Sequence, residues 1–466
     1  MNCTGLTTAK QVLSLDCTST NKLAMDLRLL CLLLVPLVTS RSAQSNPELT
    51  GHLKHIVRSA NIGGYTFATL HAVDTNTNDG TAQTKRDIEA HASGSLSDKQ
   101  SFSLHLASGE RLRMSLKRRS IDTSGGTMTE ITEDGRREVT RLQARGCFFS
   151  GPLDNGEGFA SLAMCDGRLM GSVNTAKRYY EVHALPEGAD KRSADDVTRV
   201  LVTWQDAAHA QEGMLAGDET MKRQILDKLE MHENDGIETP HDGSDDGQKR
   251  SISERTVTIE IANYLDSHYI NGIKDKLNLT TTSQITDLML NKWSAVANIF
   301  GDDQFIGWNI TLKLVALEIW RINPSWYVTN ASDSMFYRMD TICNGTKSLP
   351  YDQVTLHTGW PITHNGIGGL AWIGGVCMSR WHCIVILGGA NTNYFTELHE
   401  FGHSLGLEHE VQMSHCASDT DPVRGFMQGK PPHFRGCYRQ VLNATFTYSW
   451  KYCLHIIDNN NTVKEF

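Results

Sequence analysis

The pattern H-E-x-x-H-x-x-G-x-x-H, which spans residues 399–409, constrains this chain more than any other feature. Residues four apart lie on one face of a helix, so His399 and His403 can direct their imidazoles at one metal ion. Gly406 can adopt the left-handed conformation that ends a helix, and the chain can then turn so that His409 supplies a third nitrogen. Three neutral nitrogens leave the fourth position of a zinc ion open to water, which is typical of catalytic zinc sites.

Glu400 directly follows the first histidine of this pattern. A carboxylate at that position can address a water on the metal and take its proton. The competing interpretation is that three histidines fall by chance on a half-buried helix. Because that interpretation leaves five fixed positions unexplained, the sequence favours a hydrolytic zinc site with Glu400 as its general base.

The motif resembles the signature of the metzincin zinc endopeptidases. This resemblance implies a methionine in a tight turn beneath the metal. Met413 lies only four residues past His409, whereas Met427 lies farther along the chain, near glycines on both sides. Either residue could be an ordinary core methionine, which is the commoner role of that side chain. We predict that Met427 occupies the turn.

Further motifs narrow the resemblance to the adamalysin (reprolysin) family. In chain order they are a V-x-I-E-I strand, a G-x-A strand that runs into a cysteine, the zinc helix, a cysteine seven residues past the last histidine, and F-R-G-C with a closing C-L. They span nearly all of residues 251–456, and the stretch from Cys147 to Val173 resembles the propeptide of the same family. The resemblance implies a secreted zinc endopeptidase made as a zymogen, similar to short venom or salivary forms.

Two positions depart from the family pattern. Glu410 stands where the family usually has aspartate after the third histidine, and we interpret it as a substitution within the family. The family also includes members with a calcium ion away from the active site. Glu260 and Asp352 match two of those carboxylate positions, but Ile456 replaces an asparagine, so the resemblance supports Ca²⁺ only in part.

Composition and motifs divide the chain into successive parts. Arg28 precedes an apolar run, Leu29–Val38, that predicts a secretory signal peptide, with Met25 as the working start. No later apolar run is long enough for a membrane span, so we expect a released, extracellular protein. The predicted parts are an upstream extension with the signal peptide, 1–43; a propeptide, 44–229; a linker, 230–250; and a catalytic domain, 251–466.

The linker is strongly acidic. Residues 230–247 contain seven Asp or Glu and no Lys or Arg, a composition that cannot bury enough apolar surface to fold. It ends in Lys249-Arg250, and a dibasic pair after a flexible segment is a typical processing site. We therefore predict cleavage after Arg250, with a merely charged loop as the alternative.

The pattern of residues 251–466 predicts an α/β fold. Alternating and apolar runs predict strands at 257–261, 310–320, 366–377 and 384–387, and helices over 285–300 and 333–342. We expect a mixed twisted sheet with the active-site helix packed beneath it, which is the metzincin catalytic domain, preceded by a mainly β propeptide domain. The small residues Gly368, Gly369, Leu370 and Ala371 would let a substrate bind along the edge strand. The alternative is that these glycines only shape a loop.

Cysteine usage agrees with export. Eight of nine tryptophans and six of eleven cysteines lie beyond residue 251, as expected for a disulfide-stapled extracellular domain. Six cysteines allow fifteen pairings, and residues alone do not choose among them. The family resemblance implies Cys377–Cys453 and Cys416–Cys437, which leaves Cys343 with Cys383. Glycosylation sequons occur at Asn278, Asn309, Asn330, Asn344, Asn443 and Asn460.

In the N-terminal region Cys147 and Cys165 lie in a predicted hairpin, where a disulfide is expected, although two unrelated buried thiols are the alternative. If the pair forms, neither thiolate can occupy the zinc, and latency would then rest on steric blocking by the propeptide.

These observations favour a monomeric extracellular endopeptidase that acts on proteins or peptides and is inhibited by its own propeptide. The net charge of −9, without a basic block that carries aromatics, excludes a nucleic-acid partner from the expectation. The alternative from another class is a secreted, zinc-stabilised binding protein with a protease fold and no proteolysis. An absent glutamate would favour that alternative, but Glu400 is present.

Overall fold

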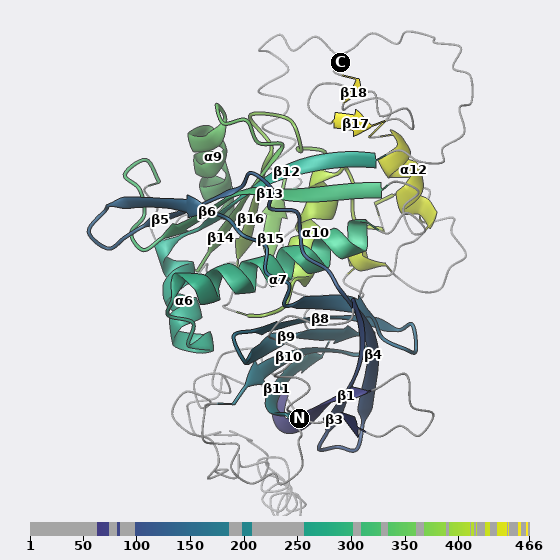
Figure 1. Cartoon of the computed structure of the whole chain (residues 1–466). Coiled ribbons are helices and arrows are strands. Elements are labelled where there is room, and N and C mark those ends of the chain that lie inside the picture. The colour runs from purple at the N-terminus through teal and green to yellow at the C-terminus, as the bar shows by residue number, and fades with distance from the viewer. Residues whose placement is uncertain are drawn as a thin grey trace, which may run out of the picture. The chain divides into compact units, whose positions relative to one another are not determined.

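Two β-sheets and the helices around the second one make up the fold (Figure 1). All described residues fall within one compact unit, 51–466. The computed structural model of the protein describes residues 63–73, 82–83, 98–185, 198–206, 256–301, 309–327, 334–359, 368–387, 391–410, 412–413, 416, 425–428, 436–444, 446, 455–457 and 463–464.

The first sheet is antiparallel and closes on itself, because its first strand also pairs with its last long strand. Strand β4 shows why it forms: Leu112, Met114 and Leu116 are buried, and polar residues alternate with them. In the order of the sheet its strands are β11 (Thr198–Asp206), β10 (Arg178–Ala184), β9 (Arg168–Thr175), β8 (Gly158–Cys165), β7 (Phe148–Pro152), β4 (Arg111–Arg118), β3 (Lys99–Leu106), β1 (Gly64–Val73) and β2 (Ala82–Gln83). We call this the N-terminal sheet.

The second sheet is mixed. Its central strands run parallel, and the short β15 pairs antiparallel at one edge. In the order of the sheet its strands are β15 (Gly369–Ala371), β16 (Cys383–Leu387), β14 (Gln353–Thr358), β12 (Thr256–Leu265), β13 (Asn309–Trp320), β5 (Thr127–Ile131) and β6 (Arg137–Arg141), and the short strands β17 (His455–Ile457) and β18 (Val463–Lys464) lie off this path, where β17 pairs with β12. We call this the catalytic sheet, because most of it lies in the region that the sequence predicts as the catalytic domain.

Helices cover both faces of the catalytic sheet. Val257, Ile259 and Ile261 of β12 pack with α7 and α10, and after a register shift Tyr264 packs with α9 on the other face. The remaining helices also contribute buried side chains to the core that contains α7 and α10. The helices are α6 (Ser267–Leu277), α7 (Thr282–Phe300), α9 (Met335–Thr346), α10 (Phe395–Ser404), the 3₁₀ turn η1 (Phe426–Gln428) and α12 (Gly436–Ala444).

Helix α7 packs against both sheets. It begins at a capping box, in which the Thr281 hydroxyl accepts from the Gln284 N–H and the Gln284 side chain accepts from the Thr281 N–H. Thirteen of its nineteen residues are buried. One continuous apolar core therefore contains side chains from α7, from the catalytic sheet and from the N-terminal sheet, among them Phe148, Phe159 and Tyr179.

Three features differ from the elements that the sequence predicts. Of the strand expected over 366–377, the structure describes 368–377, and that part is a strand only at Gly369–Ala371, because Gly374 (φ 68°) and Cys377 (φ 66°) adopt left-handed conformations that bend the chain. Strands β5 and β6 come from the region predicted as the propeptide, yet they extend the catalytic sheet. Strand β14 and helix α6 were not expected. Among the described residues no helix is both long and apolar enough to cross a membrane.

Candidate metal centre

Helix α10 carries the metal-binding motif and ends in the way that Gly406 predicts. Gly406 has φ 93°, and its N–H donates to His403 O (2.8 Å), while the Leu407 N–H donates to Gly402 O (3.0 Å). These two bonds form a Schellman motif, which satisfies carbonyls left free at the helix end. The Gly374 N–H donates a second bond to His403 O (2.9 Å), and the Val376 N–H donates to one more of these carbonyls, that of Ser404 (3.2 Å). The bend at 374–377 therefore fixes the end of α10.

The three histidines converge. Nε2 of His409 lies 3.0 Å from Nε2 of His399 and 3.2 Å from Nε2 of His403. Zn–N bonds of about 2.05 Å in a tetrahedral site would separate the nitrogens by about 3.3 Å, so the observed spacing suits zinc. All three side chains are buried, and they form a group among the described residues whose ligand atoms all lie within 4.8 Å of one another. The donor set therefore fits a zinc ion with a position left for water.

The opposite ring nitrogens of two histidines contact backbone carbonyls. His399 Nδ1 lies 3.2 Å from Phe426 O, and His403 Nδ1 lies 2.6 Å from Leu407 O. When Nδ1–H donates to these carbonyls, the lone pair of Nε2 is left for the metal. Burial, together with the neighbouring imidazoles, holds the pKa of His403 well below its usual value. His403 is therefore neutral, as a metal ligand must be.

Met427 lies beneath the metal-binding helix. A Cβ on Gly402 would come within 2.6 Å of the Met427 sulfur, so the glycine is what allows this close packing. Met427 is fully buried in η1, and the carbonyl of the preceding Phe426 is the one that His399 contacts. The rival candidate, Met413, instead packs 4.0 Å from the sulfur of Cys416.

Glu410 connects the third histidine to this methionine turn. Its Oε1 accepts a hydrogen bond from Gly425 N (2.5 Å) and another from the Tyr438 hydroxyl. The same hydroxyl accepts from Met427 N (3.2 Å). Glu410 thus positions the turn directly at Gly425 and indirectly through Tyr438 of α12. The glutamate that stands where the sequence comparison led us to expect aspartate therefore has a structural role.

Glu400 points at the edge strand β15. A Cβ on Gly369 would lie 2.5 Å from Glu400 Cγ and 2.7 Å from its Oε1, which is too close for any other residue at position 369 without a shift. Gly369, Leu370 and Ala371 are buried, and Gly368 is half-buried. The structure therefore explains one of these predicted small residues by the room it leaves for the carboxylate of Glu400.

Comparison with known proteins agrees with this geometry. Residues 289–410 match the family described as Metallo-peptidase family M12B Reprolysin-like. This part of the chain is similar to a reprolysin-like metallopeptidase. A curated relative of this domain, "A disintegrin and metalloproteinase with thrombospondin motifs adt-1" from Caenorhabditis elegans, is 24% identical over 174 residues. The match covers 34% of this chain and 12% of that protein, so the chain spans only a small part of that relative's length.

Solved structures resemble the reprolysin-like chain only weakly. Metalloproteinase-II from Bacteroides fragilis is 14% identical with a TM-score of 0.32, over 72% of this chain and 88% of that one. A chain in the structure of a chaperone-substrate complex is 12% identical with a TM-score of 0.29, over 41% of this chain and 35% of that one. Both TM-scores are below 0.5, so neither establishes a shared fold.

A buried ion pair lies under the reprolysin-like motif, and sequence reasoning missed it. Lys292 Nζ of α7 lies 2.8 Å from Glu397 Oε1 of α10 and 3.1 Å from Asn391 Oδ1. Burial alone would lower the pKa of Lys292, but Glu397 beside it raises that pKa overall. The pair holds α10 on α7. The only sequence signal was a glutamate and a lysine inside otherwise apolar helix faces.

Three disulfides join described cysteines of the reprolysin-like chain: Cys147–Cys165, Cys343–Cys383 and Cys416–Cys437. These are pairs that the sequence and the family resemblance led us to expect. Cys377 is also disulfide-bonded. Its predicted partner Cys453, like the predicted processing residue Arg250, lies outside the described residues.

The positions matched to a calcium site already contain a cation. Lys313 Nζ lies 2.8 Å from Glu260 Oε1, and Asp352 Oδ2 accepts from Glu260 N (2.7 Å). Ile456 pairs with Val257 in the adjoining strand β17. One carboxylate of the two is thus neutralised by lysine, and calcium has no support from this geometry.

Proposed function

We propose that this chain is a zinc-dependent metalloendopeptidase that hydrolyses peptide bonds of extracellular proteins. The observation that carries the proposal is the convergence of three buried Nε2 atoms, with that of His409 3.0 and 3.2 Å from the other two, in a motif where Glu400 directly follows the first histidine. His399, His403 and His409 would hold the zinc, and Met427 would support them from below.

The chemistry divides between the metal and the protein. A zinc ion held there supplies a Lewis acid that lowers the pKa of water and polarises a carbonyl. Glu400 takes the proton of the attacking water and returns it to the leaving amine. Gly369 keeps the space in which this carboxylate lies, and Glu410 holds the turn that supports His399.

The substrate would bind along β15. This strand is the terminal one of the catalytic sheet among the described residues, so one of its sides does not pair with another described strand. An extended peptide can add to such an edge through main-chain hydrogen bonds, with Gly368 to Ala371 as its contact. The scissile carbonyl would then lie near Glu400, which packs on the same strand.

Secretion and zymogen processing are part of the proposal. We take residues 1–43 to contain the signal peptide, 44–229 to be the propeptide and Arg250 to be the processing site. The disulfides support an oxidising compartment. Because Cys147 is bonded to Cys165, latency in this proposal does not rest on a thiolate from this pair. It rests on steric blocking of the cleft in the uncut chain, which cutting the linker relieves. The chain is proposed to act as a monomer.

The decisive experiment compares the full chain, cut in its linker, with its Glu400→Ala variant on a quenched peptide library and a denatured protein. The cut full chain is used because the N-terminal sheet shares a core with the catalytic part. Loss of a general base typically costs 10²- to 10⁴-fold in rate, so we expect a loss of at least about 100-fold. A chelator should abolish the wild-type activity, and added zinc should restore it.

The controls separate chemistry from folding. Glu400→Ala should bind as much zinc as the wild type, and Glu157→Ala, in an exposed turn, should leave the rate unchanged. Cleavage that survives both Glu400→Ala and the chelator would refute the proposal. A folded, zinc-loaded wild type that cuts nothing would favour the binding-protein function instead.

A further inference from the structure

The segment that leads into the metal-binding helix is hydrogen-bonded to the N-terminal sheet. The Thr392 hydroxyl donates to Gly171 O (2.5 Å), and Thr392 N donates to Glu181 Oε2 (3.4 Å). Asn174 Nδ2 donates to Asn393 Oδ1 (3.1 Å). Thr392 and Asn174 are almost completely buried, so water replaces neither partner while the contact lasts.

Aromatic contacts with the N-terminal sheet extend this hydrogen-bonded region into the first turn of α10. The ring of Phe159 meets Tyr394 edge-on at 5.8 Å, and the ring of Tyr179 lies 5.3 Å from Phe395. Tyr394 and Phe395 are at most 1% exposed. Four consecutive residues, 392–395, thus contact the N-terminal sheet only four residues before His399.

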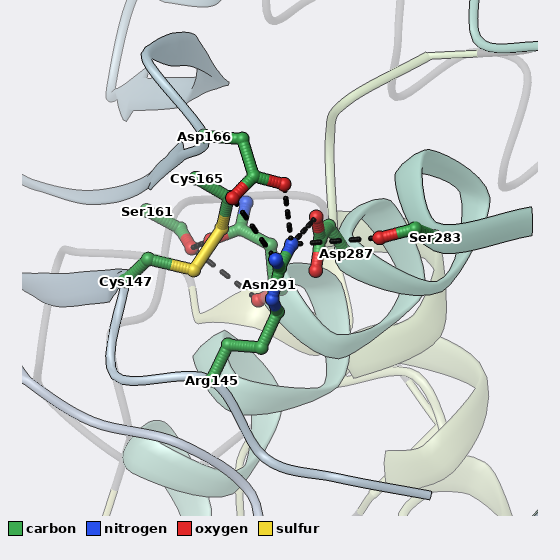
Figure 2. Close-up of a disulfide and its surroundings, with 8 residues drawn as sticks. All are labelled: Arg145, Cys147, Ser161, Cys165, Asp166, Ser283, Asp287 and Asn291. Carbon is green, nitrogen blue, oxygen red and sulfur yellow. Dashed lines mark hydrogen bonds and ion pairs between the residues drawn. A yellow bond between two sulfur atoms is a disulfide. The ribbon is translucent and has the colours of Figure 1, made fainter. Parts of the chain in front are cut away.

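A second contact region is a polar stripe on α7. Asp287, Asn291, Ser294 and Asn298 recur at helical spacing, and each bonds to a residue of the N-terminal region. Figure 2 shows the part around the Cys147–Cys165 disulfide, where Arg145 bridges Asp166 and Asp287 (2.7 Å to Asp287 Oδ2). The remaining bonds are Ser161 Oγ to Asn291 Oδ1 (3.1 Å), Ile121 N to Ser294 Oγ (2.9 Å) and Asn298 Nδ2 to Ser150 Oγ (3.0 Å).

The third contact region is the β13 edge of the catalytic sheet. Strand β5 pairs with it in parallel over five residues, from Thr127 opposite Ala316 to Ile131 opposite Trp320. Glu130 of β5 accepts from Arg321 Nε (2.7 Å) and from the Thr282 hydroxyl (2.7 Å). The hairpin thus pairs a strand edge that would otherwise be open.

We propose that the N-terminal region, residues 63–206, stays bound to the catalytic part after the linker is cut, as a second subunit that supports the start of α10. The proposal rests on the proposed function only in treating the linker as the processing site. Its partner is specific: the catalytic part of this same chain, joined at α10, at α7 and at β13.

Whether the N-terminal region stays bound or dissociates depends on how strongly each of the three contact regions resists replacement by water. The polar stripe of α7 alone would tolerate water, since each of its hydrogen bonds contributes only about 1 kcal/mol net. Water cannot replace the aromatic contacts of α10 or the pairing of β5 with β13 in the same way, because dissociation would expose buried aromatic rings and an unpaired strand. The regions also lie on one folded body, so dissociation must break all of them together.

The same contacts bear on the metal centre. Tyr394, the N-cap of α10, makes no side-chain capping bond; Asn393 Oδ1 accepts from Phe395 N (2.9 Å) instead. That same oxygen accepts from Asn174 of the N-terminal sheet. Asn174 is therefore a positioning residue, because it holds the group that caps the helix that carries His399 and Glu400.

The test uses the full chain with Glu400→Ala, so that self-digestion plays no part and failure of the proposed chemistry cannot affect the result. Residues 248–251 are replaced by the site of a sequence-specific protease, the linker is cut, and the sample is passed over a sizing column with light scattering. We expect one 1:1 particle that holds both fragments at micromolar concentration. Separate peaks, or a fragment that aggregates alone, would overturn the proposal.

Hydrogen exchange tests the support of α10. In the cut particle, Asn174→Ala or Thr392→Val should speed exchange of the first α10 amides about tenfold, as the loss of one buried hydrogen bond implies. Arg113→Ala, which alters an exposed residue of β4, should not. Asn174 and Thr392 lie on opposite sides of the contact, so if one of these two variants fails to fold, the other still provides the test. Unchanged exchange in the folded variants would rule out the supporting role.

Discussion

Gly369 shows how a single missing Cβ shapes the candidate active site. Any side chain there would come within 2.5 Å of Glu400 Cγ, so Gly369→Ala must push the carboxylate away from its position. A displacement of about 1 Å can cost on the order of 100-fold in rate. We expect kcat/KM to fall by about that factor while zinc content and thermal stability stay near those of the wild type.

Gly436→Ala is the matched control, because a Cβ there meets nothing within 4 Å. Peptide hydrolysis and bound zinc are measured side by side for both variants. If Gly369→Ala kept full activity, the close approach of strand and glutamate would have no part in catalysis.

The residues of the metal centre differ in how far sequence could predict them. His399, His403 and Glu400 were accessible because helical geometry over four residues fixes their relation. Met427 needed the family resemblance. The ion pair of Lys292 and Glu397 could not be predicted, because 105 residues separate its members. A single charged residue in an apolar helix does not indicate which residue neutralises it.

At the scale of elements, strand β10 brings an acid to the contact with the catalytic part. Burial raises the pKa of Glu181 to about 7, against an unfolded value of 4.5, although the Thr392 N–H, Lys292 of α7 and Lys276 of α6 each lower it. His183 of the same strand lies 3.7 Å away. The pKa of Glu181 is higher in the folded than in the unfolded chain. Its contribution to the free energy of unfolding is therefore complete below about pH 4.5 and is lost as the pH rises through 7.

Glu181→Gln should remove this dependence. Relative to the wild type, the variant should gain about 1–3 kcal/mol of unfolding free energy between pH 4.5 and pH 8, because it carries no charge to bury. Denaturant unfolding at several pH values measures the difference, and the exposed Glu157→Gln serves as the control. A pH profile parallel to that of the wild type would show that Glu181 does not carry the effect.

Helices and strands were predicted correctly where a local sequence pattern determines them. The prediction was wrong or incomplete where contacts with distant residues determine the structure. Strands β12, β13 and β16 and helix α7 follow from periodicity, since each buries one face or both. The strand expected over 366–377 was too long, because the loop after Ala371 instead bonds to the carbonyls at the end of α10. The hairpin of β5 and β6 has a recognisable alternation, but nothing local says that it pairs with β13, about 190 residues away.

For the whole molecule, the shared core predicts that the two sheets unfold as one unit. The linker composition predicts a boundary at 230–250, yet Ile121, Leu142 and Phe159 from before it pack in the same core as α7 and α10. Strand β5 also crosses this boundary to complete the catalytic sheet. The boundary predicted from composition is where we propose that the chain is cut, whereas the shared core determines which parts stay together.

This coupling predicts that damage inside the N-terminal sheet will be felt in the catalytic part. Leu104 is fully buried in the separate core of that sheet, so Leu104→Ala should cost about 2–5 kcal/mol. Eight of the nine tryptophans lie beyond residue 251, so tryptophan fluorescence reports the unfolding of the catalytic part. If the chain unfolds as one unit, this fluorescence midpoint should fall together with that of circular dichroism. A fluorescence midpoint that ignores Leu104→Ala would mean that the two sheets unfold independently, and cutting the linker would then be enough to let them part.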